Sequence, residues 1–238
     1  MSLVRSGPHA GWAGLIPLQA YLLHDGRTAP RYSIAPHIMY FPAGGIACGK
    51  STVSSVLQES GCHLIDADEV ARQVQQPGHS AYLQIVASFG AAVLDSDGTI
   101  NRAALGSAVF GKTDKNRRAL QELNAIMHPA IAKECLWQLV HHGLLRGRSV
   151  VYDAALMAES GTWMACWPQV LNIQVKPEVQ VARLMKRNSL TETEANARVA
   201  VQASPEHRQS VANKTIDNSY GSIEDLQHKA MQAVANWL

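Results

Sequence analysis

The chain carries at positions 44–51 the sequence Gly44-Gly45-Ile46-Ala47-Cys48-Gly49-Lys50-Ser51. This stretch fits the pattern G-x-x-x-x-G-K-[ST] of phosphate-binding loops without a gap. Glycines let the backbone turn tightly and direct several N–H groups at one concavity, and a helix that follows adds its positive N-terminal end. We therefore expect Lys50 to reach the β- and γ-phosphates of a nucleotide and the Ser51 hydroxyl to bind Mg²⁺. A glycine turn with a purely structural role is the alternative.

The flanking sequence supports a phosphate loop between a strand and a helix. Residues 38–41 form a short apolar run, and residues 50–60 favour a helix that ends before Gly61. Pro42 is unusual at this place, because proline cannot donate a hydrogen bond to a central strand. We expect the strand to end at Phe41, unless the sequence upstream of Ala43 is not the native lead-in. For Cys48, a thiol pKa lowered by the helix dipole and simple occupation of a small-residue position are both open.

The rest of the chain alternates strand-like and helix-like segments. Further strands are expected at residues 62–65, 149–152, 170–175 and 214–217. Helices are expected at 69–76, 79–89, 102–110, 114–127, 129–142 and 222–238, and residues 191–194 have the spacing of a capping box. This alternation predicts an α/β fold with a parallel, five-stranded core sheet flanked by helices.

Composition places the chain among ordinary globular proteins. Its 238 residues are long enough to bury a full core, and 47% of them are hydrophobic. The net charge of +2 gives no electrostatic case for nucleic acid as a partner. No apolar run is long enough to span a membrane. The four cysteines form no CxxC pair and no metal-ligand spacing, which predicts reduced thiols in a cytoplasmic protein: Cys48, Cys62, Cys135 and Cys166.

The N-terminal residues 1–37 differ from the remainder in composition. They contain Arg5, Arg27 and Arg31 but only one acidic residue, Asp25, and they show no sustained periodicity. Basic, acid-poor character is typical of a mitochondrial or other organelle transit peptide. The alternatives are a disordered tail and upstream sequence that does not belong to the mature protein. The sequence thus divides into an extension over 1–37 and a domain over 38–238, and it carries no signal for an oligomeric state.

Two possible guanine-nucleotide signals do not support a GTPase. Residues 95–98 match D-x-x-G, but aspartate and glycine are also the usual turn residues between apolar runs. Residues 213–217 miss the N-K-x-D pattern by one position. A guanine-specific pocket is therefore not expected.

A series of further motifs follows the loop in a characteristic order. It comprises Asp66-Ala67-Asp68 with Glu69, Ala71 and Arg72, then Pro77-Gly78, Asp97-Gly98, Arg102, Leu105, Phe110, Asn124 and His128-Pro129, then Gln180, Arg183, Arg187, Thr191, Glu194, Ala195, Arg198 and Gln202, and finally Ile216-Asp217-Asn218. This series resembles the dephospho-CoA kinases over about residues 44–238. The resemblance implies a P-loop kinase fold with a helical acceptor-binding insertion and a lid over about residues 176–208. It also implies ATP with Mg²⁺ and dephospho-CoA as the partners of the reaction.

The resemblance implies roles for particular residues. Asp68 is the expected catalytic base for the ribose 3′-hydroxyl, with Arg183 and Arg187 of the lid acting with Lys50 on the transferred phosphate. The expected ATP-binding residues are the loop itself with Thr52 and Asn218. Arg72 and His128 are expected at the acceptor, and Asp66 in a structural or metal-shell position. For the aspartates turn-capping is the alternative, and for the arginines a solvated basic helix face.

Two departures from the family pattern bear on this expectation. Residues 153–159 read Asp-Ala-Ala-Leu-Met-Ala-Glu, where the family has a proline and an aromatic residue, and Pro42-Ala43 replaces the usual lead-in to the loop. Two other functions therefore stay open at this point: a different small-metabolite kinase of the same fold, and a nucleotide-binding protein without catalysis.

Overall fold

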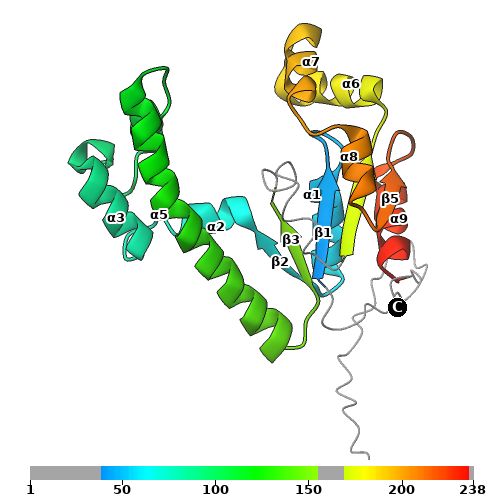
Figure 1. The fold of residues 1–238 in the computed structure, drawn as a ribbon. Helices are drawn as coiled ribbons and strands as arrows, with labels where there is room; N and C mark the ends of the chain where they lie inside the picture. The colour runs from blue at the N-terminus through cyan, green and yellow to red at the C-terminus, as the bar shows by residue number, and fades with distance from the viewer. Residues whose placement is uncertain (1–38, 155–168, 236–238) are drawn as a thin grey trace, which may run out of the picture. The chain divides into compact units, whose positions relative to one another are not determined.

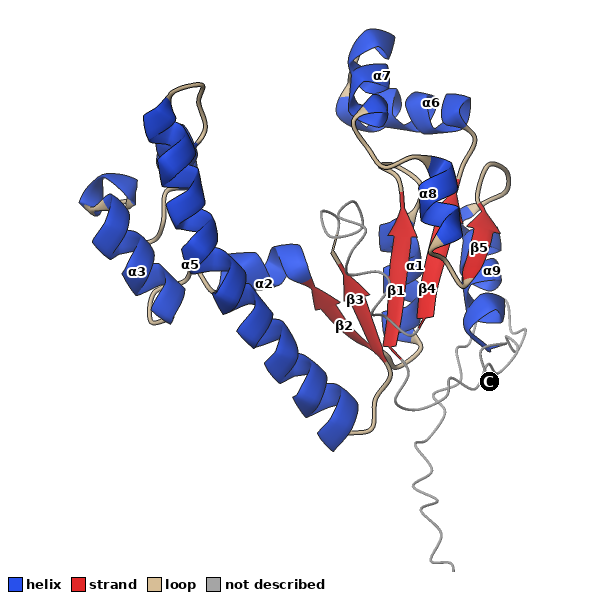
Figure 2. Ribbon diagram, in the orientation of Figure 1, coloured by secondary structure: helices blue, strands red, loops and turns tan. Residues whose placement is uncertain are grey.

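A computed structural model describes residues 39–154 and 169–235, all within one compact unit that spans Ile34–Leu238. Its five strands are all parallel and stand in the order β2-β3-β1-β4-β5 (Figures 1 and 2). Their bounds are β1 Met39–Gly44, β2 His63–Asp66, β3 Val150–Asp153, β4 Gln169–Gln174 and β5 Lys214–Asp217. The parallel five-stranded sheet confirms the expected fold class.

Helices connect these strands. They are α1 Lys50–Glu59, α2 Ala67–Gln73, α3 Ser80–Phe89, α4 Arg102–Val109, α5 Asp114–Gln138, α6 Pro177–Asn188, α7 Glu192–Ala200, α8 Pro205–Ser210 and α9 Ile223–Ala235, with a 3-10 turn at Ala91–Val93 and a π-helix at Leu139–Leu145. In Figure 2, α1 and α9 lie on one face of the sheet and α8 on the other. Within the described residues, no helix is long and apolar enough to cross a membrane.

Strand β1 runs through Pro42 to Gly44, so the expectation that it ends at Phe41 is wrong. Its ladder to β4 continues from Tyr40 to Gly44, whereas its ladder to β3 covers only Met39 and Tyr40. The ladder to β3 has therefore ended before the position at which proline's missing N–H would leave a gap. The sheet accepts Pro42 at its centre because one of the two neighbouring ladders is short there.

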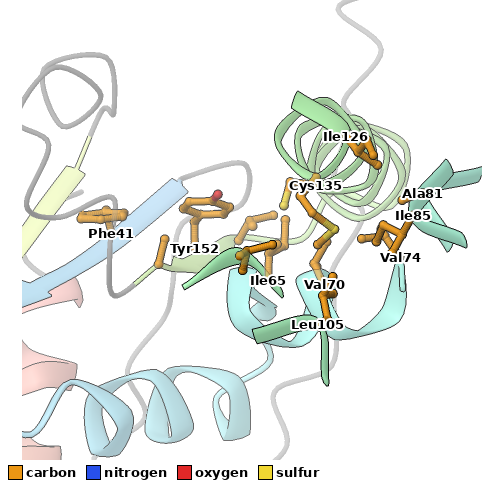
Figure 3. Close-up of a cluster of buried hydrophobic side chains, with 14 of the residues drawn as sticks. Phe41, Ile65, Val70, Val74, Ala81, Ile85, Leu105, Ile126, Cys135 and Tyr152 are labelled. Atoms are coloured by element: carbon orange, nitrogen blue, oxygen red, sulfur yellow. The ribbon is translucent and has the colours of Figure 1, made fainter. Parts of the chain in front are cut away.

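The core lies between the sheet and the helices that cover it. Phe41 of β1 and Tyr152 of β3 stack at a centroid distance of 6.2 Å. Ile65 of β2, Val70 of α2 and Cys135 of α5 continue the same buried cluster (Figure 3). Central parallel strands read as continuous apolar runs because both of their faces are covered. Cys48, Cys62 and Cys135 are free and buried, as expected of reduced thiols, and Cys166 lies outside the described residues.

Residues 114–138 form one helix, α5, with Pro129 inside it. The expectation of two helices that meet at His128 and Pro129 is therefore wrong. Proline removes one helical hydrogen bond, but tertiary packing can override that local preference. Ile126, Met127 and Cys135 are buried on either side of Pro129, and these contacts hold both halves on the same core.

The segment between β4 and β5 contains α6, α7 and α8. The capping box expected at Thr191 is present: the Thr191 Oγ accepts from the Glu194 N–H at 3.3 Å, and the Glu194 carboxylate accepts from the Thr191 N–H at 2.9 Å. Residues 95–98 form a turn, with the Gly98 N–H donating to the Asp95 carbonyl at 2.9 Å. The turn interpretation of that D-x-x-G match is confirmed.

Candidate active site

Because all five strands are parallel, their carboxyl ends meet at one edge of the sheet. The loop 44–51 follows β1 at this edge and leads directly into α1. Gly49 has φ 104°, and a Cβ there would lie 2.8 Å from both the Asn218 side chain and the Leu226 side chain. Only glycine fits that position. The loop therefore closes tightly over the start of α1, in the form expected of a phosphate-binding loop.

Lys50 lies on the inner side of the loop. Its Nζ donates to the carbonyl oxygens of Gly44 at 2.8 Å and Gly45 at 3.2 Å. These are weak, neutral acceptors compared with a phosphate, so the ammonium group can exchange them for one. Ser51 and Thr52 follow in the first turn of α1, with Ser51 exposed and Thr52 partly buried. The lysine and the hydroxyl thus stand at the same helix N-terminus.

Asn218 and Arg183 both lie beside the loop. The Asn218 side chain is buried and its Nδ2 donates to the Cys48 carbonyl at 2.9 Å. The Arg183 guanidinium donates to the Asn218 carbonyl at 2.9 Å. Contact of Asn218 with adenine stays a prediction, since the side chain's visible role is to hold the loop.

Arg187 is not brought to the same place as Arg183. It is exposed in the last turn of α6, and its Nε donates to the Asn188 side chain at 3.0 Å. The two arginines are four residues apart on one helix, but only Arg183 makes a hydrogen bond to the residues around the loop.

The pKa of the Cys48 thiol depends on its burial and on the charged groups around the loop. Burial raises its pKa, which favours the small-residue alternative over a thiol whose pKa is lowered by the helix dipole. Three cations oppose this rise in pKa: Lys50, Arg208 and Arg183. Arg208 is itself buried and donates to the Ala203 carbonyl. Sequence reasoning missed Arg208, and its position between α7 and β5 gave no local signal.

The carboxylates gather at the ends of the neighbouring strands β2 and β3. Asp66 caps α2, accepting from the N–H groups of Asp68 at 2.9 Å and Glu69 at 3.1 Å, so the capping alternative holds for Asp66. Asp68 lies exposed in the first turn of α2. Asp66 and Asp153 are register partners across β2 and β3.

Asp153 is a functional candidate that sequence reasoning missed. Its carboxylate accepts from the Ser54 hydroxyl of α1 at 2.7 Å. Burial raises the pKa of Asp153, the Ser54 hydrogen bond and Lys50 oppose this, and Asp66 and Asp68 add to it. Asp153 therefore lies near the lysine of the loop and near the other two carboxylates. Its place at the end of a buried strand was the signal that could have found it.

Arg72 and His128, the two residues expected at the acceptor, have different contacts. The Arg72 Nε is 3.0 Å from the Glu69 carboxylate and 3.2 Å from the Asp68 carbonyl, so Arg72 stands next to the expected base. His128 is exposed on α5. Within residues 39–154 and 169–235, no hydrogen bond or ion pair joins His128 to the loop or to the carboxylates. A role for His128 at the acceptor stays a prediction.

The donor set suits Mg²⁺ carried by a nucleotide and not a metal held by protein alone. Among the described residues, no group of three or more His, Cys, Asp or Glu side chains could hold a metal. Mg²⁺ keeps several waters and usually takes one or two protein oxygens together with substrate phosphates. The Ser51 hydroxyl and the carboxylates beside Lys50 are oxygen donors of that kind. The residues present therefore fit the ion.

Comparison with known proteins agrees with this geometry. A family model described as dephospho-CoA kinase matches residues 42–225. A dephospho-CoA kinase of Geobacillus kaustophilus is 40% identical over 198 residues, which cover 82% of this chain and 94% of that protein. One of Carboxydothermus hydrogenoformans is 40% identical over 197 residues, covering 82% and 91%.

Solved structures show the same fold. A crystal structure from Thermus thermophilus has a TM-score of 0.67 at 27% identity and covers 84% of this chain and 97% of that one. The dephospho-CoA kinase of Campylobacter jejuni has a TM-score of 0.58 at 24% identity, covering 83% and 96%. At this level of identity, the second likeness concerns the fold alone.

Proposed function

The chain belongs to the dephospho-CoA kinase family, and we propose that it transfers the γ-phosphoryl group of ATP to the ribose 3′-hydroxyl of dephospho-CoA. The family match over residues 42–225 carries this proposal. The arrangement of charges supports it, since Asp153 is influenced by Lys50 of the loop on one side and by Asp66 and Asp68 on the other. A phosphoryl-transfer site needs such a pairing of a phosphate-binding cation with nearby carboxylates.

In the proposed reaction Lys50 leaves the Gly44 and Gly45 carbonyls for the phosphates of ATP. The 3′-oxygen forms a bond to the γ-phosphorus as the bond from that phosphorus to the β,γ-bridging oxygen breaks, and ADP is released. Asp68 accepts the proton of the 3′-hydroxyl. Arg183 and Arg208 add positive charge near the loop, which favours the negative charge of the transferring group. Arg187 joins them only if α6 changes position.

The Ser51 hydroxyl would hold the Mg²⁺ that accompanies ATP. The Asp153 and Asp68 carboxylates would accept hydrogen bonds from water molecules bound to that ion. Bound there, it would neutralise charge on the β- and γ-phosphates. The part-buried Ser54–Asp153 hydrogen bond of 2.7 Å positions the Asp153 carboxylate.

A coupled assay of ADP release with dephospho-CoA as acceptor tests the proposed reaction. We expect turnover with dephospho-CoA and none above background with AMP or shikimate. Turnover with one of those acceptors instead would identify another small-metabolite kinase. ATP binding without transfer to any acceptor would identify a binding protein without catalysis.

The assignment of the base rests on a matched pair of substitutions. Asp68→Asn removes the proton acceptor, and we expect kcat to fall by about 10²–10⁴-fold with ADP affinity unchanged. Asp66→Asn keeps a side-chain oxygen for the cap of α2, because asparagine is an equally good N-cap residue. We expect at most about a tenfold loss there. The reverse order of the two effects would assign the base to Asp66, and an unchanged kcat in Asp68→Asn would exclude Asp68.

A further inference from the structure

The backbone of Ile46, in the middle of the phosphate loop, is held by two glutamine side chains, one at its N–H and one at its carbonyl. The Ile46 N–H donates to Oε1 of Gln202 at 3.0 Å. The Ile46 carbonyl accepts from Nε2 of Gln180 at 2.9 Å. A side-chain amide can serve either as donor or as acceptor, and here one glutamine supplies each function. Both backbone groups of this residue are therefore engaged before any nucleotide binds.

The two glutamines come from the segment between β4 and β5, far from the loop in sequence. Gln180 is buried on α6, at 5% exposure. Gln202 follows the end of α7, where its own N–H donates to the Val199 carbonyl and its Nε2 to the Arg198 carbonyl at 3.3 Å. The Gln202 side chain is thus held by α7 as well as by Ile46. The pair joins the phosphate loop to α6 and to the end of α7.

The loop needs such support because its backbone is strained next to Ile46. Ala47 has φ 59°, a left-handed conformation that an alanine adopts at a cost of about 1 kcal/mol. Gly45, on the other side, has the glutamines so close that a Cβ there would lie 2.5 Å from the Gln180 Nε2 and 2.9 Å from the Gln202 Oε1. A side chain at position 45 would therefore displace the ends of these two glutamines from Ile46, although the φ of Gly45 itself is not in the left-handed region.

We propose that Gln180 and Gln202 are positioning residues of the phosphoryl-transfer site. They hold the N–H and the carbonyl of Ile46 so that the remaining loop N–H groups and Lys50 are positioned for the phosphates, and they make the loop move together with α6 and α7. This inference rests on the proposed function only for its kinetic consequences. The clamp itself concerns nucleotide binding and holds for any acceptor.

The first experiment replaces each glutamine by methionine, which keeps the side-chain length but forms no comparable hydrogen bond. We expect Gln180→Met and Gln202→Met each to weaken ADP binding, measured by calorimetry, by about tenfold. Both hold the backbone of the same residue, so the two effects should be coupled and the double variant should fall well short of their product. Gln209→Met, at an exposed position on α8, is the matched control and should bind ADP like the wild type.

Kinetics and unfolding separate positioning from a merely structural role. We expect kcat/KM for ATP to fall with the ADP affinity while KM for dephospho-CoA and the unfolding midpoint of the nucleotide-free protein stay unchanged. Wild-type ADP affinity in both methionine variants would overturn the proposal. So would a loss of affinity matched by an equal loss in the Gln209→Met control.

The second experiment uses the close approach at Gly45. Gly45→Ala in the wild type places a methyl group against both glutamines, and we expect ADP binding to weaken by at least about tenfold. In a Gln180→Ala, Gln202→Ala background the obstructing atoms are gone, and the same substitution should change affinity by less than about threefold. An equal effect of Gly45→Ala in both backgrounds would contradict the clamp. Because ADP binding needs no acceptor, the result stands even if dephospho-CoA proves not to be the substrate.

Discussion

Asp153 shows how a single residue acquires its properties from neighbours distant in the sequence. Its carboxylate lies against Ser54 of α1, near Lys50, and across from Asp66 of β2. Burial raises its pKa, so the folded protein holds a proton on this carboxyl more tightly than the unfolded chain does. The energy gained from that proton is present below the pKa of the unfolded chain and is lost as pH rises through the higher, folded pKa.

We therefore predict a pH-dependent effect of Asp153→Asn on stability. As pH rises from about 4 to about 7, the free energy of unfolding of the variant should increase relative to the wild type, because asparagine carries no charge to bury. Urea unfolding at the two pH values measures this. Asp97→Asn is the control of opposite sign: hydrogen bonds from Thr99 lower the pKa of Asp97, so that variant should lose stability relative to the wild type over the same interval. A change of the same sign in the relative free energy of unfolding of both variants would contradict the opposite directions of the two pKa shifts.

The residues of the loop have the conformation that the motif predicts. The residues of other elements that contact the loop cannot be predicted from the motif. The left-handed glycine at Gly49 and the inward Lys50 are what the pattern requires. The bond from Asn218 to the Cys48 carbonyl, and the nearby guanidinium of Arg208, come from elements far along the chain. The catalytic role of Asp68 and the acceptor roles of Arg72 and His128 stay predictions.

At the scale of elements, α7 depends on its first turn. Thr191 and Glu194 form a reciprocal capping box, in which the Glu194 carboxylate also accepts from the Thr191 hydroxyl at 2.8 Å. Alanine at an N-cap position costs about 1 kcal/mol of helix stability. Since α7 ends next to Gln202, the order of this helix bears directly on the clamp at Ile46.

We predict that Thr191→Ala loosens α7 without disturbing the sheet. Amide hydrogen exchange over residues 192–200 should become about fivefold faster, and ADP binding should weaken slightly, while exchange in β1 and β4 stays unchanged. Thr193→Ala, at an exposed position on the same helix, is the control and should leave exchange unchanged or slower. Unchanged exchange in Thr191→Ala would mean that tertiary packing and not the capping box holds this helix.

Two elements differ from their sequence-based expectations, and both involve proline. Pro42 lies inside β1, and Pro129 lies inside α5. Proline opposes both elements locally because it lacks an N–H. In each case burial of the neighbours decides: Phe41 and Ala43 flank the first proline in the core, and Ile126 and Met127 precede the second. Proline does disfavour both elements locally, but the burial of the neighbouring residues outweighs that preference.

At the scale of the whole molecule, the buried core and the site belong to residues 39–235. The core cluster draws on β1, β2, β3 and β4 with α2, α3, α4 and α5, and all the site residues described above lie in the same range. The basic extension over residues 1–37 and the altered run from residue 155 to 159 fall outside the described residues, so the expectations about them stay predictions.

We predict that a chain shortened by residues 1–36 keeps its fold and its turnover. Its thermal unfolding midpoint should lie within about 3 °C of the full chain, and its kcat with dephospho-CoA within about twofold, because the buried core cluster of the described residues is built from residues beyond 38. Loss of cooperative unfolding in the shortened chain would show that the extension contributes to the domain.

The sequence by itself determined the family, the parallel α/β fold and the phosphate loop, because each is written in short-range patterns: glycine and lysine at fixed spacing, apolar strands between helices, caps and turns. Only the tertiary structure decided which distant residues meet that loop. The Ile46–Gln202 bond joins residues 156 positions apart, and Ser54 and Asp153 are 99 apart. No local pattern encodes such pairs, since they arise from the order in which parallel strands align their carboxyl ends. The loop could therefore be predicted from its own eight residues, whereas the distant residues that hold it in shape could not.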